Sequence, residues 1–133
     1  ALSLRRGGHI AVEENAWIRT EVPAFAEYLA IVERLLAEGG KRLYVGDELG
    51  NWSDQRLTVV LNQTVPIVTR DCDAARMFAM NLETLRHGPA IKDRYAEKDI
   101  QRLAMKLGWL AENAGVARSI SFGRQRVVYA WRG

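Results

Sequence analysis

Apolar residues recur three or four positions apart in three stretches of the sequence, which is the spacing of an amphipathic helix. Each stretch ends at a glycine, the residue that most readily adopts the left-handed conformation found after helices. The pattern therefore predicts three helices, over residues 23–38, 72–87 and 97–114. Asp71 precedes the second stretch, and we expect it to be the N-cap of that helix.

Runs of β-branched and aromatic residues predict extended segments between the helices. Residues 9–19 are expected to form one or two short strands, and residues 41–45 and 65–69 one strand each. Pro66 indicates that the last of these lies at a sheet edge or a strand end, because proline cannot donate a ladder hydrogen bond. Residues 55–61 fit a helix or a strand equally well, and the pattern leaves both open.

Helices and strands are interleaved in this order without regular βαβ units, which indicates the α+β class. The length of 133 residues suits one domain and is sufficient to bury a core. We therefore expect a small single domain over residues 1–133, with residues 1–8 as a loose N-terminal arm. A turn or short helix within residues 89–95 would join the second and third helices.

The last predicted helix separates apolar and basic residues onto opposite faces. Its apolar face contains Ile100, Leu103, Ala104, Leu107, Leu110, Ala111 and Ala114. Its polar face carries three cations, each four positions from the next: Lys98, Arg102 and Lys106. Met105 and Trp109 lie within the polar face, where a tryptophan can stack on a nucleobase or anchor a protein partner. We assign Trp109 and Met105 to an interface.

The residues that follow this helix predict a two-stranded β-hairpin over 116–131. Gly123-Arg124 fits a two-residue type II′ turn, in which glycine comes first. Counting outward from this turn places Ile, Val, Tyr, Trp and Phe side chains on one face, which we expect to pack on the helix. Arg124 then lies at the tip of the hairpin, and Arg126 points away from the core.

The run from Leu107 to Arg118, continued by Ser119 to Arg132, resembles the end of a winged helix-turn-helix domain. In that superfamily a recognition helix with a Leu–x–x–Leu stretch turns on an Asn/Gly pair into an arginine-rich hairpin. The resemblance implies a winged-helix-like part over about residues 72–132. It also implies that the exposed helix face enters the major groove of DNA and that the wing touches phosphate or the minor groove.

Carried onto this sequence, the resemblance implies a set of DNA-contacting residues on the helix and the wing. They are Lys98, Gln101, Arg102, Met105, Lys106, Arg124 and Arg126. Charge agrees with this reading, since residues 96–133 hold seven cations and three acids, whereas residues 21–54 hold three cations and seven acids. We expect a non-enzymatic nucleic-acid-binding module of regulatory or mobile-element-associated type, with duplex DNA as the partner. The alternative for these cations is that they only keep the surface hydrated.

Two further functions stay open. A protein-interaction module would use the Met105 and Trp109 face, and the partner could be a second copy that forms a homodimer. A Mg²⁺-dependent nuclease would need converging carboxylates, and acids do gather in two places along the sequence. They are Asp47, Glu48, Asp54, Asp71 and Asp73. Loop acids and a helix cap explain them more simply, so we expect no catalytic residue, no metal and no cofactor.

Composition adds limits on compartment and partner. Cys72 is the only cysteine, which excludes an internal disulfide and fits a reducing cytoplasm. The histidines, His9 and His87, have no metal-ligand spacing with it. No apolar run approaches the roughly 18 residues that cross a bilayer, and no signal peptide is visible, so we expect a cytoplasmic protein without a membrane partner.

Overall fold

The computed structural model describes residues 7–52 and 56–132. Most of the predicted arm of residues 1–8 lies outside the described residues. The elements, in chain order, are β1 (His9–Thr20), α1 (Pro23–Glu38), the 3₁₀ helix η1 (Gly46–Trp52), β2 (Leu57–Thr69), α2 (Asp71–Leu85), α3 (Pro89–Lys92), α4 (Glu97–Asn113) and β3 (Ile120–Trp131). Strands paired in one sheet together with packed helices confirm the predicted α+β class.

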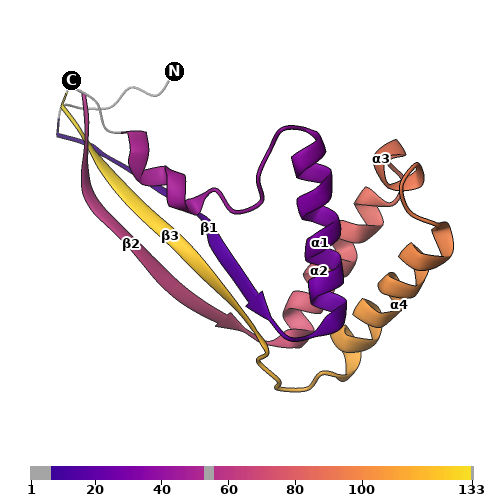
Figure 1. Ribbon diagram of the computed structural model, residues 1–133. Helices are drawn as coiled ribbons and strands as arrows, with labels where there is room; N and C mark the ends of the chain where they lie inside the picture. The colour runs from indigo at the N-terminus through magenta and orange to yellow at the C-terminus, as the bar shows by residue number, and fades with distance from the viewer. Residues whose placement is uncertain (1–6, 53–55, 133) are drawn as a thin grey trace. The chain divides into compact units, whose positions relative to one another are not determined.

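The three strands form one sheet in the order β1-β3-β2, so the last strand of the chain is the central one (Figure 1). Both pairings are antiparallel. Gly7 N–H donates to Trp131 O at 2.7 Å and Trp131 N–H donates to Gly8 O at 2.8 Å on the β1 side. Arg132 N–H donates to Arg56 O at 2.7 Å on the β2 side. The strand β3 therefore supplies both of its neighbours with hydrogen-bond partners.

The predicted hairpin over residues 116–131 is wrong, because β3 runs without interruption through Gly123 and Arg124. Gly123 does not have the positive φ that a type II′ turn requires at its first central position. Its missing side chain serves a close approach instead, since a Cβ at Gly123 would lie 2.2 Å from the indole ring of Trp17. The described chain has no wing of the predicted kind in this region.

Strand β2 resolves the ambiguity over residues 55–61, because the strand extends from Leu57 to Thr69 without a break. Pro66 lies within it, and β2 is an edge strand, as the proline predicted. The predicted strand at residues 41–45 is wrong. Val45 O accepts Glu48 N–H at 3.0 Å and so belongs to the first turn of η1 rather than to a sheet ladder.

The described residues group into two compact units. The first, called the sheet unit, falls within residues 1–18, 44–67 and 122–133; the second, the helical unit, covers residues 19–43 and 68–121. In the sheet unit, Leu49 of η1 packs on the buried side chains of Val127 and Tyr129. Tyr129 donates its hydroxyl to Leu49 O, and its ring stacks on Trp52 with centroids 6.0 Å apart. These contacts attach η1 to one face of the sheet.

The helical unit is built from α1, α2 and α4, with the single-turn helix α3 between the last two (Figure 1). Phe78 of α2 meets Phe25 of α1 edge-on at 5.4 Å and stacks on Tyr28 at 4.4 Å. Leu103 and Leu107 of α4 are fully buried. The three helices predicted from periodicity are therefore confirmed, and the same apolar stripes that predicted them form their core.

Two glycine substitutions test this account of β3. Gly123→Ala should destabilise the protein by about 1–3 kcal/mol, because the new methyl group overpacks against Trp17. Gly108→Ala is the matched control, since a Cβ there meets nothing within 4 Å and an α4 interior position gains about 1 kcal/mol from alanine. Urea unfolding measures both. Equal stability of Gly123→Ala and the wild type would contradict the close approach.

Candidate nucleic-acid interface

The outward face of α4 carries every helical residue predicted to contact DNA. All of them are exposed: Lys98, Gln101, Arg102, Met105 and Lys106, together with Trp109. The two apolar members are unusually open to solvent, with Met105 70% and Trp109 62% exposed. This set is called the α4 face below. Its position on the helix follows from the burial of the opposite stripe in the core of the helical unit.

The α4 face keeps a positive charge although the helix itself has as many acids as cations. Glu97 is held by Arg86 of the α2 C-terminus at 2.5 Å. Asp99 lines a cleft against α1 and lies 3.9 Å from Arg102. Within residues 7–52 and 56–132, neither Lys98 nor Lys106 has an ion-pair partner. These two ammonium groups are therefore available to an anionic ligand.

An apolar cleft adjoins the C-terminal half of the α4 face. It has a volume of about 380 Å³ and lies between α4 and the start of α1. Lys106, Trp109 and Leu110 of α4 line the cleft, together with Val22 and Pro23 from the start of α1. A flat or apolar group can bind here next to a cation, which suits a stacked ring or an apolar side chain of a partner.

The two predicted wing residues lie elsewhere. Arg124 and Arg126 belong to β3 in the sheet unit, not to a hairpin tip. Arg124 Nη1 donates to Asn15 Oδ1 at 3.1 Å. Arg126 donates through Nε to Glu13 Oε1 at 3.0 Å, and the two residues form an ion pair. Both arginines therefore hydrogen-bond across to β1, and their predicted placement on a wing is wrong because β3 continues through both of them. Their contact with DNA stays a prediction.

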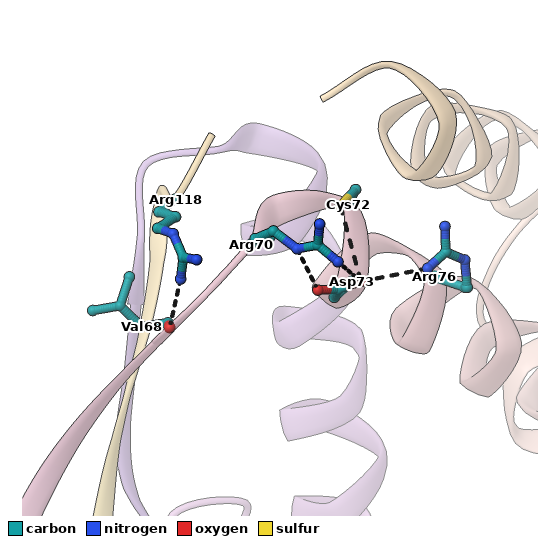
Figure 2. A network of polar contacts seen from close by, with 6 residues as sticks. All are labelled: Val68, Arg70, Cys72, Asp73, Arg76 and Arg118. Carbon is teal, nitrogen blue, oxygen red and sulfur yellow. Dashed lines mark hydrogen bonds and ion pairs between the residues drawn. The ribbon is translucent and has the colours of Figure 1, made fainter. Parts of the chain in front are cut away.

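A second group of cations gathers at the start of α2 (Figure 2). Arg70 Nε donates to Asp73 Oδ2 at 2.9 Å, and Arg76 Nη1 lies 3.4 Å from Asp73 Oδ1. The hydrogen bond from Arg70 holds the pKa of the Asp73 carboxyl below its ordinary value. Arg118 Nη1 donates to Val68 O at 3.3 Å and adds its charge to the same surroundings. Two guanidinium groups thus pair with one half-buried carboxylate, and a third adds its charge from farther away.

Asp71 fixes where Arg118 lies. The residue is the first of α2 rather than its N-cap, a position held by Arg70, so the predicted cap is wrong by one residue. Its carboxylate is 3% exposed and accepts Ser119 N–H at 2.6 Å. Asp71 N–H in turn donates to Ala117 O at 2.8 Å. The connection from α4 to β3 is therefore attached to the first turn of α2 by two hydrogen bonds.

Sequence reasoning missed this second group as a site. Arg70, Asp73 and Arg76 recur every three residues across the start of a predicted helix, and that spacing places their side chains near one another. Arg118 comes from a segment 42 residues beyond Arg76, and no local pattern indicates that it approaches α2. The helical spacing was a usable signal for the first three residues, but not for Arg118.

The acids proposed for a nuclease are divided between the two units of the structure. Asp47 and Glu48 belong to η1 in the sheet unit, whereas Asp71 and Asp73 belong to the helical unit and are engaged as described above. Asp54 lies outside the described residues. Over residues 7–52 and 56–132, no group of three or more His, Cys, Asp or Glu side chains is placed to hold a metal ion. In the same ranges, no helix combines the length and apolar character needed to cross a bilayer.

None of the protein-family models searched matches the chain, and the search of curated proteins found no match. The winged-helix resemblance stays a prediction from sequence.

Substitutions at Asp71 test the attachment of the α4–β3 connection. Asp71→Ala should lower the free energy of unfolding by about 1–3 kcal/mol, because the part-buried hydrogen bond from Ser119 N–H to a charged acceptor is lost. Asp71→Asn keeps an acceptor oxygen and should lose less. Hydrogen exchange at the Ser119 amide should be slow in the wild type and fast in Asp71→Ala. An exchange rate that is the same in all three proteins would contradict the attachment.

Proposed function

We propose that this protein is a non-enzymatic nucleic-acid-binding module that contacts duplex DNA through the α4 face. The observation that carries the proposal is the exposed row of Lys98, Arg102 and Lys106, two of which have no ion-pair partner in the described part of the chain. Phosphate is the abundant anion of nucleic acids, and ammonium and guanidinium groups are its usual protein ligands. The proposal needs no wing.

The dimensions of α4 suit this role. Lys106 lies eight positions after Lys98, which corresponds to about 12 Å along a helix axis. The major groove of B-DNA is about 12 Å wide and admits an α-helix. Long side chains at both ends of the row can then reach phosphates, while Gln101 lies between them at a position where an amide can pair with adenine. Met105 and Trp109 add apolar contact area.

The double variant Lys98→Gln/Lys106→Gln should weaken binding to duplex DNA of any sequence. Each lost phosphate contact lowers the slope of log K against log salt concentration by about 0.9, so the double variant should lose about 1.8. Fluorescence anisotropy with a labelled duplex over a salt series measures the slope. Lys41→Gln/Lys92→Gln is the matched control, because it removes two exposed cations of the helical unit that lie outside α4.

Comparison of the two double variants distinguishes DNA contact by the α4 face from attraction of DNA to the net positive charge of the protein. A smaller slope only in the α4 variant supports the proposal. Equal losses in both variants would show attraction to net charge alone, and a wild-type protein that binds no duplex even at low salt would defeat the proposal.

A second candidate is a homodimer through the same face, favoured by the large exposure of Met105 and Trp109. The occupant would be a second copy, with its α4 antiparallel to the first and the two-fold axis at Met105. Positions whose numbers sum to the same value then face each other, which places Lys98 opposite Glu112 and Gln101 opposite Trp109. Glu112 is exposed, so this arrangement brings opposite charges together at both ends.

Substitutions that reverse the charges of Lys98 and Glu112 test the proposed dimer. Light scattering should give twice the chain mass of 15.0 kDa for the wild type, and a value near the chain mass for Lys98→Glu, because two acids then face each other. Lys98→Glu/Glu112→Lys reverses the pair and should restore the dimer. A wild type that stays monomeric at high concentration excludes this candidate and leaves the DNA proposal untouched.

A further inference from the structure

The helical unit also contains a polar cleft, and none of its lining residues belongs to the α4 face. It has a volume of about 560 Å³ and is formed where β1 and β2 end and β3 begins. Arg19 and Arg118 line it, and both guanidinium side chains are exposed. The space is larger than a single ion needs, so a segment of a larger ligand can enter.

Three hydroxyl groups lie among the same lining residues: Thr20, Ser119 and Ser121. Thr20 Oγ1 accepts Val22 N–H at 3.2 Å, which leaves its own O–H free to donate. Arg118 gives one of its five N–H donors to Val68 O, so four remain for a ligand. A guanidinium fork beside hydroxyl donors is the donor set that binds phosphate oxygens.

The cleft is held in place before any ligand arrives. Arg118 and Ser119 follow Ala117, and the bonds from Asp71 to Ala117 O and Ser119 N–H fix this segment against α2. The backbone N–H of Ser119 is engaged with Asp71, and the same residue lines the cleft. A site whose backbone is already ordered loses less entropy when it binds.

The formal charge of the cleft indicates which kind of phosphate-containing ligand it fits. Glu21 also lines the cleft, so the lining residues, with two arginines and one glutamate, have a formal charge of +1. A phosphodiester carries one negative charge, whereas a phosphate monoester carries nearly two at neutral pH. We propose that this cleft binds one backbone phosphodiester of a nucleic acid strand, as a contact separate from the α4 face. The inference rests on the proposed function, because it takes nucleic acid as the ligand.

The test compares a charged and a neutral side chain of nearly the same size at one position of the cleft. Ser119→Asp should weaken binding to a duplex without terminal phosphates by about tenfold or more, because the carboxylate repels the phosphodiester. Ser119→Asn, of nearly the same size but neutral, is the control and should bind almost as the wild type does. Arg118→Gln should lower the salt slope by about one. Ser121→Asp and Ser121→Asn repeat the comparison in case Ser119→Asp disturbs Asp71 and unfolds the protein.

Outcomes separate this inference from the proposed function. In one outcome, the Lys98 and Lys106 variants lose affinity while Ser119→Asp and Ser121→Asp bind as their Asn controls do. That result would support DNA binding by the α4 face and contradict phosphodiester binding in the cleft. If the Asp variants alone lose affinity, phosphodiester binding in the cleft is supported and DNA binding by the α4 face is contradicted. Titration with inorganic phosphate, followed through the Ser119 and Ser121 amide NMR signals, distinguishes the source. Tighter binding of inorganic phosphate than of duplex DNA would overturn the phosphodiester assignment in favour of a small phosphorylated ligand.

Discussion

The central position of β3 determines how the last residues of the chain are used. β1 and β2 do not pair with each other, so each depends on β3 for its hydrogen bonds. Side chains on β3 then become cross-strand partners, as Arg124 does with Asn15 and Arg126 with Glu13. Arg124 and Arg126 are therefore engaged within the sheet unit, whereas Lys98 and Lys106 of the helical unit have no ion-pair partner among the described residues.

The parts of the fold that sequence predicted are those set by local periodicity. The helices α1, α2 and α4 each bury a stripe that recurs every three or four residues, and this repeat is visible without knowledge of the partner. The hairpin was mistaken because Gly123 has two possible reasons to be glycine. A turn would be visible in the neighbouring residues, whereas contact with Trp17 comes from more than a hundred residues away. Local spacing alone cannot distinguish the two.

The candidate site was predicted in part for a similar reason. Periodicity gave the α4 face, because exposure follows from the position of a residue on an amphipathic helix. From charge alone, the sequence predicted four cations equally as DNA contacts: Lys98, Lys106, Arg124 and Arg126. The structure separates them, since the first two have no acidic partner in the described ranges and the last two bond to β1. Only the tertiary partners of a cation show whether it is available to a polyanion.

The acids of α4 make the two ends of the α4 face electrostatically different. Glu97 is the acid nearest the start of the helix, and its pairing with Arg86 reduces its repulsion toward a phosphate. Glu112, near the end, is exposed and would repel one. The positive end of the helix dipole also lies at the start, where Lys98 and Arg102 are found. A duplex would therefore meet the N-terminal half of α4 most favourably, which is how recognition helices present their first residues to the major groove. A second copy would need Glu112 as well as Lys98, so the dimer would use both ends of the helix.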